Sequence, residues 1–156
     1  MGNGRNSYNV YGTPRSRISG GLKTRIIIIG APGSGKGTRA RTLGKMFNIA
    51  VITVGDMLRE AASIGTEQGL IAKDYMNRGE LVPDKIVISI MEKRLTRTDV
   101  ERGFILDGFP RSIKQAITLD GILKRLNAKI DHVITIVARS ETIVDRISLR
   151  RICPNC

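Results

Sequence analysis

A glycine-rich stretch at 30–38, with the sequence GAPGSGKGT, constrains this chain more than any other feature. The β-branched run at 26–29 before it predicts a buried strand, and a helical pattern over 36–47 follows it. In a strand, turn and helix of this kind, backbone N–H groups point into one concavity at a helix N-terminus, where the dipole favours anions. Lys36 adds a mobile cation. The stretch therefore predicts a phosphate-binding loop. Its candidate contact residues are Gly33, Ser34, Gly35, Lys36, Gly37 and Thr38.

Strand and helix patterns alternate along the rest of the chain, which predicts an α/β fold with a parallel sheet and helices on both faces. Further strands are expected at 50–53, 104–106 and 133–137. Further helices are expected at 56–62, at 66–78 with Gly79 as the stop, from Pro83 and Asp84 onward, at 112–126, and from a capping Ser140 through Ile147. The side chains predicted to face inward are Ala40, Leu43, Phe47, Val87, Ile90, Met91, Leu95, Ala116, Leu119, Leu123 and Leu126.

The formal net charge of +12 calls for an anionic partner, either a small polyphosphate or a nucleic acid. Aromatic residues make up only 4% of the chain and Trp is absent, which argues against a platform that stacks nucleic-acid bases. The basic residues are spread along the chain without a recognition module, so we expect no nucleic-acid partner. No run of about 18 apolar residues occurs, so we expect no membrane partner either.

Residues 1–22 contain no acidic residue and few apolar ones, which predicts a disordered basic arm. The two cysteines stand near the C-terminus and cannot form a disulfide framework, so a reducing compartment is expected. We expect the cytoplasm. A mitochondrion or plastid stays open, because an Arg- and Ser-containing start without acids also fits a transit peptide.

Two further segments, VGDMLR at 54–59 and DGFPRS at 107–112, accompany the phosphate loop. Within the loop, Gly37 separates Lys36 from Thr38, whereas the commoner pattern has Ser or Thr directly after the lysine. Together these motifs resemble the nucleoside monophosphate kinases, and among them the adenylate kinases with a long, zinc-binding lid. The resemblance implies a P-loop parallel sheet, incomplete at the C-terminus, and reversible phosphoryl transfer from MgATP to AMP giving two ADP.

The resemblance also implies roles for individual residues. The implied catalytic residues are Lys36, Asp107, Arg111 and Arg150. On the ATP side, the loop residues are joined by Arg146, which would pack over the base. The implied AMP-binding residues are Val54, Arg59, Val82, Gly108, Arg111 and Gln115. Asp107 follows a predicted strand, where a carboxylate can hold Mg²⁺ through its water shell.

Two of these positions bear on the choice of base. Gln115 matches the residue that reads adenine in adenylate kinases, whereas pyrimidine monophosphate kinases usually have Asn there. Val54 stands where adenylate kinases usually have Thr, so the pocket lacks a hydroxyl. A UMP/CMP-type kinase therefore remains the alternative within the enzyme class.

The chain ends with Cys153 and Cys156 in a C-x₂-C pair, half of a four-ligand zinc site. By resemblance this end lies inside the lid, so zinc is expected only in the complete protein. We expect the 156-residue chain alone to be poorly stable or inactive. A non-catalytic ATP-binding fragment is the alternative from another class.

The expected organisation has four parts, and a monomer is expected. These parts are a basic arm (1–22), a core nucleotide-binding domain (23–52 and 83–144), a monophosphate-binding segment (53–82) and the start of a lid (145–156).

Overall fold

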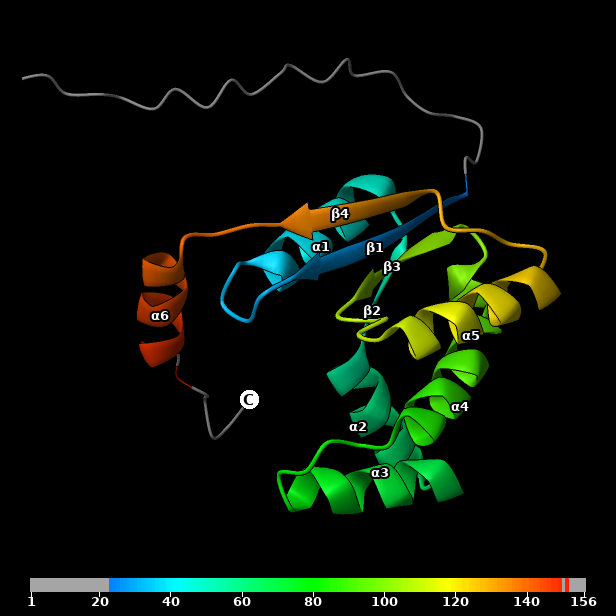
Figure 1. Cartoon of the computed structure of the whole chain (residues 1–156). Coiled ribbons are helices and arrows are strands. Elements are labelled where there is room, and N and C mark those ends of the chain that lie inside the picture. The colour runs from blue at the N-terminus through cyan, green and yellow to red at the C-terminus, as the bar shows by residue number, and fades with distance from the viewer. Residues whose placement is uncertain (1–22, 150, 152–156) are drawn as a thin grey trace, which may run out of the picture.

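A computed structural model describes residues 23–149 and residue 151 (Figure 1). Its four strands form one parallel sheet in the order β2-β3-β1-β4. The strands are β1 (Thr24–Gly30), β2 (Ala50–Thr53), β3 (Gly103–Asp107) and β4 (His132–Ile136). All four lie within one or two residues of the predicted segments, and the α/β prediction is confirmed.

Six helices and one short 3-10 turn connect the strands within the described residues. They are α1 (Lys36–Phe47), α2 (Val54–Ile64), α3 (Glu67–Asn77), α4 (Asp84–Leu95), η1 (Thr98–Val100), α5 (Ile113–Arg125) and α6 (Ser140–Ser148). Thr53, Thr66 and Ser112 cap α2, α3 and α5, because each hydroxyl accepts a hydrogen bond from the backbone N–H three residues on. None of the helices is long and apolar enough among the described residues to cross a membrane.

Successive side chains of β1 point to opposite faces of the sheet, so the core has one part on each face. Ile26 and Ile28 pack with Ala40 of α1 on one face. Ile27 faces the other way and joins the larger cluster, which is built from α2, α4 and α5. Successive side chains of a strand point to opposite faces, so one isoleucine run serves both clusters. The predicted inward residues of α4, from Val87 to Leu95, are all buried in the larger cluster.

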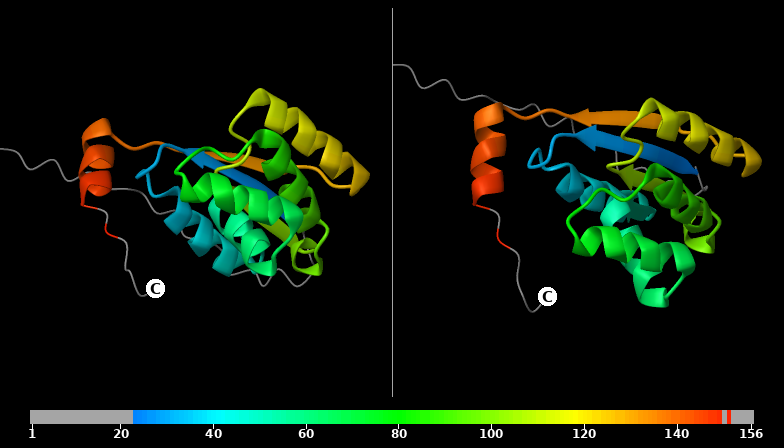
Figure 2. Two further views of the ribbon diagram at one scale, coloured as in Figure 1. Left: turned by 90° about the horizontal axis from the view of Figure 1, so that it is seen from below. Right: turned by 60° about the horizontal axis from the view of Figure 1, so that its bottom comes forward.

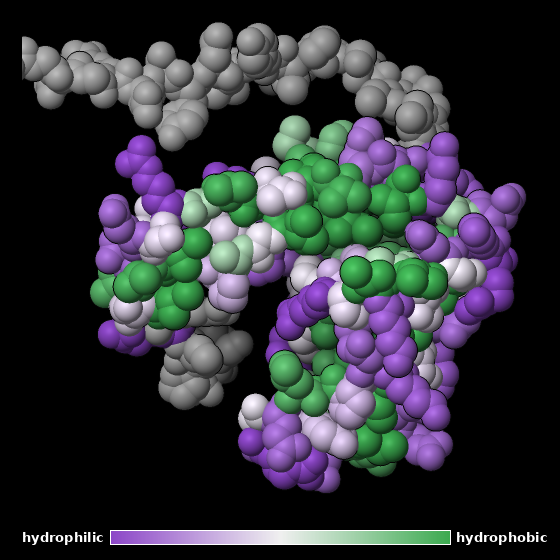
Figure 3. Space-filling view, viewed as in Figure 1, coloured by the Kyte–Doolittle hydropathy of each residue, from purple (hydrophilic) through white to green (hydrophobic). Residues whose placement is uncertain are grey.

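Two parts of the chain project from the sheet. Helices α2 and α3 form a lobe below it, and α6 stands beside the loop that joins β1 to α1 (Figures 1 and 2). Apolar residues gather along β4 in the space-filling view (Figure 3). β4 lies at an edge of the sheet, and Val133 and the following Val137 are exposed.

Four local predictions were wrong. Ile29, in the run at 26–29 that was predicted to be buried, is 36% exposed near the end of β1. Phe47 is 45% exposed, because it is the last residue of α1 and the chain turns away at Asn48. Leu126 is also exposed, because α5 ends at the residue before it; Ile122 takes the inward position instead. Ser140 does not cap α6. It is the first helical residue, and the backbone of Arg139 occupies the cap position without a side-chain hydrogen bond.

A pair of substitutions in α5 tests the core. Leu119 is 2% exposed and Ile117, on the same helix, is 67% exposed. We expect Leu119→Ala to lower the free energy of unfolding by about 2–5 kcal/mol, because it removes buried methyl groups and leaves a cavity. Ile117→Ala should change it by no more than about 0.5 kcal/mol. Urea denaturation of the full-length protein measures both, and equal losses would contradict this core.

Candidate functional site

The loop between β1 and α1 has the backbone shape that an anion site requires. Gly33 and Gly35 have positive φ values of 79° and 89°, which side-chain-bearing residues rarely adopt. Gly35 occupies the cap position of α1, and no side chain accepts from the free N–H groups of the first turn. These N–H groups are therefore available to an anion.

Helix α6 packs directly against this loop. Arg146 donates a hydrogen bond from Nη1 to the carbonyl oxygen of Gly33 over 3.3 Å. A Cβ on Gly33 would lie 3.1 Å from the side chain of Ile147 and 3.2 Å from the carbonyl oxygen of Ile143. The structure thus brings Arg146 to the phosphate loop, 113 residues beyond Gly33 in the chain.

A cavity of about 670 Å³ opens beside the loop. Its charged lining residues are Lys36, Arg39, Arg41, Asp56, Arg59, Asp107 and Arg146. Five of these seven side chains are cationic and only two are acidic. Such an excess of convergent cations on a helix N-terminus suits a polyphosphate. Gly33, Gly35, Gly37, Thr38 and Thr53 complete the lining.

Two buried oxygen atoms at this site have no hydrogen-bond partner among the described residues. They are Oγ of Ser34 and Oδ1 of Asp107. Oδ2 of the same aspartate lies 3.2 Å from the position that a Cβ on Gly37 would take, so the carboxylate faces the loop. Unpaired buried polar atoms are costly. An oxygen-preferring cation with its water shell fits this carboxylate, and Mg²⁺ is such a cation.

Asp56 organises the start of α2 opposite the loop. The hydroxyl of Thr53 donates to its Oδ2 over 2.6 Å, and Arg59 donates from Nη2 to its Oδ1 over 2.5 Å. These two hydrogen bonds lower the pKa of Asp56, and the positive charge of Arg41 adds to the effect. The carboxylate therefore stays ionised and holds the Arg59 guanidinium at the cavity wall.

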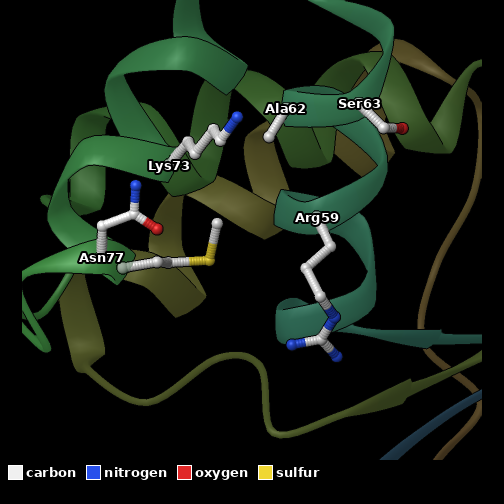
Figure 4. A pocket seen from close by; sticks show the side chains of 6 residues that line it. Arg59, Ala62, Ser63, Lys73 and Asn77 are labelled. Carbon is white, nitrogen blue, oxygen red and sulfur yellow. The ribbon is translucent and has the colours of Figure 1, made fainter. Parts of the chain in front are cut away.

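A second pocket, of about 410 Å³, lies between α2 and α3. Figure 4 shows Lys73 of α3 pointing toward Ala62 of α2, whereas the Arg59 guanidinium is directed away from Lys73. Ser63 and Met76 complete its lining. Arg59 lines both this pocket and the cavity at the phosphate loop. The Arg59 side chain therefore borders both cavities.

The remaining predicted site residues lie after β3, in α5, at the start of α2 and before α4. Arg111 is exposed, and its Nε donates to the carbonyl oxygen of Gly108 over 2.7 Å. Gln115 is buried in the first turn of α5. Val54 and Val82 pack against the larger core cluster, each partly buried. Arg150, Cys153 and Cys156 lie outside the described residues, as does the predicted arm at 1–22.

Sequence reasoning missed several residues that the fold brings to the site. Arg39 and Arg41 follow the phosphate loop directly, so their place on α1 could have identified them. No local pattern distinguishes Lys73 or Asp84, because each meets its partners only through tertiary packing. Within the described range, no group of three or more His, Cys, Asp or Glu residues could hold a metal ion.

A parallel sheet with a glycine-rich anion loop after β1, and a carboxylate at the end of β3, defines the P-loop fold. The family model for adenylate kinase matches residues 28–151. Adenylate kinases of Archaeoglobus fulgidus and Caldicellulosiruptor bescii are 54% and 53% identical to the chain over 131 and 132 residues. These alignments cover 84% and 85% of the chain. The chain belongs to the adenylate kinase family.

The chain spans only part of the length of these relatives. The matched region is 60% of the Archaeoglobus fulgidus protein and 61% of the Caldicellulosiruptor bescii protein. The adenylate kinase of Pseudothermotoga lettingae is 49% identical over 132 residues, and the matched region is 61% of its length.

The cap at α2 provides a test by titration. Thr53→Val removes the hydroxyl that donates to Asp56, so the pKa of this carboxyl should rise towards its ordinary value. NMR titration of the Asp56 carboxyl carbon in the full-length protein measures this pKa. Thr66→Val, which removes the equivalent cap of α3, should leave that pKa unchanged.

The sign of the linked stability follows from the lowered pKa. The hydrogen bonds of Asp56 stabilise the folded state above the unfolded pKa of about 3.9, and this contribution is lost as the pH falls through the folded value. In Thr53→Val the free energy of unfolding should therefore fall less steeply as the pH is lowered. An unchanged Asp56 pKa in this variant would contradict the arrangement.

Proposed function

We propose that the full-length protein catalyses reversible phosphoryl transfer from MgATP to AMP, giving two ADP. The observation that carries this proposal is the position of Arg59. It lines the cationic cavity at the phosphate loop and also the pocket between α2 and α3. A guanidinium at the wall of the cavity beside the phosphate loop could hold the phosphate of a second nucleotide next to the ATP phosphates, as transfer between two nucleotides requires.

The family membership supports the same reaction, since all three of these relatives are named adenylate kinase. In this proposal the phosphate loop and Lys36 hold the ATP phosphates, and Arg146 contacts the ATP base from α6. Arg59 and Arg111 grip the AMP phosphate. Gln115 reads the AMP base, with Val54, Val82 and the Gly108 backbone around it. Arg150 would add a cation at the transferred phosphoryl group.

The acceptor phosphate is already an anion, so no general base is required. Catalysis then consists of holding the two nucleotides in line and neutralising the charge that spreads over the transferred group. Asp107 would hold Mg²⁺ through its water shell, which fits the unpaired Oδ1 of this carboxylate. The bound ion would supply further charge neutralisation at the phosphates.

The lobe of α2 and α3 suggests how the site excludes water. We infer that the segment 53–82 closes over AMP and that the lid, beginning near residue 145, closes over ATP. Closure would prevent hydrolysis of ATP. Zinc bound by Cys153 and Cys156 in the complete protein is proposed as a support for that lid.

We propose that the protein acts as a monomer, because all residues assigned to the two nucleotide sites come from one chain. The cytoplasm is the proposed compartment, since the matched relatives come from bacteria and archaea.

Two substitutions test the reaction. In the full-length protein, Lys36→Ala and Arg111→Ala should each lower kcat for ADP formation by about 100-fold or more, because each removes a cation from the transition state. Lys45→Ala, on the same helix as Lys36 but in its last turn, should stay within about twofold of the wild type, as expected for a residue outside the site. A coupled assay of ADP formation provides the measurement.

The same assay separates the alternatives. Unchanged rates in the Lys36 and Arg111 variants would overturn the assignment of these residues. ATP binding without ADP formation by the wild type would indicate a non-catalytic nucleotide-binding protein. A higher kcat/KM for CMP or UMP than for AMP would indicate the pyrimidine monophosphate kinases.

A further inference from the structure

Gln115 is only 6% exposed, and both ends of its side-chain amide form hydrogen bonds. Its Oε1 accepts a hydrogen bond from the backbone N–H of Arg111 over 2.7 Å. Its Nε2 donates to Oδ1 of Asp84 over 2.5 Å. Asp84 is the first residue of α4 and lies 31 residues before Gln115 in the chain. Packing of α4 against α5 therefore brings these two side chains together.

The two partners differ in hydrogen-bonding character, and this difference determines which way the amide points. The backbone N–H of Arg111 can only donate, and an ionised Asp84 carboxylate can only accept. If the Gln115 amide turned by half a rotation, its NH₂ would face the N–H and its oxygen would face the carboxylate. Both contacts would then be repulsive. The observed orientation is the one that satisfies both partners.

These bonds leave the amide with one free N–H on Nε2 and one free lone pair on Oε1, so the donor and the acceptor that remain have fixed positions. An aromatic base that carries an amino group beside an unprotonated ring nitrogen complements this order. The amino group donates to Oε1, and the ring nitrogen accepts from Nε2. A base with an oxo group beside a protonated ring nitrogen presents the reverse order and would need the turned amide.

We propose that Asp84 is a positioning residue for base selection. It holds Gln115 in the orientation that accepts a 6-aminopurine monophosphate and rejects a 6-oxopurine monophosphate. This inference rests on the proposed function, in which Gln115 contacts the base of the acceptor nucleotide. Asp84 itself acts only through Gln115.

Asp84 also stands in the first turn of α4, where any carboxylate would stabilise the helix dipole. That role alone would affect stability and would leave the choice of base unchanged. The ratio of kcat/KM for AMP to kcat/KM for IMP separates the two roles, because loss of stability lowers the active fraction equally for both acceptors.

The test uses full-length wild type, Asp84→Ala and Asp84→Asn, with ATP as the donor and AMP or IMP as the acceptor. Glu67→Ala is the matched control, because it removes an exposed first-turn carboxylate from α3. Asp84→Ala should lower the AMP/IMP ratio by about tenfold or more, mainly through a higher KM for AMP, with the KM for ATP unchanged. Glu67→Ala should leave the ratio within about twofold of the wild type, as expected for a surface substitution.

Asp84→Asn keeps the shape of the side chain and can either accept from or donate to Gln115. It should retain most of the kcat/KM for AMP while lowering the AMP/IMP ratio, because it supports both amide orientations. If Asp84→Ala does not fold, as judged by its thermal transition, the AMP/IMP ratio of Asp84→Asn alone tests the inference.

An AMP/IMP ratio within about twofold of the wild type in the folded Asp84 variants would overturn the inference. Wild type that forms no ADP from ATP and AMP would instead overturn the proposed function. The two failures are therefore distinguishable in one set of assays.

Discussion

The alignment of β1 with β3 is the constraint on which the rest of the site depends. In this parallel pair Ile28 lies opposite Asp107, and the backbone N–H of Gly108 donates to the carbonyl oxygen of Ile28 over 3.4 Å. The carboxyl ends of both strands therefore meet at one edge of the sheet. At this edge the phosphate loop follows β1 and Asp107 ends β3. The phosphate loop and the Asp107 carboxylate therefore border the same cavity.

Arg59 connects this edge of the sheet to the lobe of α2 and α3. Its guanidinium is held by Asp56, which is held in turn by the Thr53 cap. An exposed ion pair of this kind contributes little to stability, on the order of 0–1 kcal/mol. Its value lies in position, because it directs one cation between two pockets while keeping it accessible. The same pattern recurs at Gln115, where Asp84 and the Arg111 backbone hold a buried amide in one orientation.

Much of the fold was predictable from local pattern. The isoleucine run of β1 and the helical spacing of α4 identified their elements correctly, because hydrophobic periodicity follows directly from strand and helix geometry. The predicted inward residues of α4 are all buried, whereas Ile29 at the end of the isoleucine run is 36% exposed. Errors arose where elements end. Phe47 and Leu126 match their helical patterns, but the chain turns away from the sheet beside each of them. Ser140 fits a capping pattern, but α6 begins at Ser140 itself, so Arg139 occupies the cap position.

The sequence by itself determined the phosphate loop and its lysine, because backbone curvature, glycine content and charge are all local properties of 30–38. The motifs at 54–59 and 107–112 added the family resemblance, which assigned Arg146 to the ATP side. Only the tertiary structure decided which contacts the distant side chains make. Arg146 reaches the loop through the packing of α6, and Asp84 reaches Gln115 through the packing of α4 on α5. Contacts between residues 31 to 113 positions apart leave no periodic trace in the chain, since they depend on how whole elements pack.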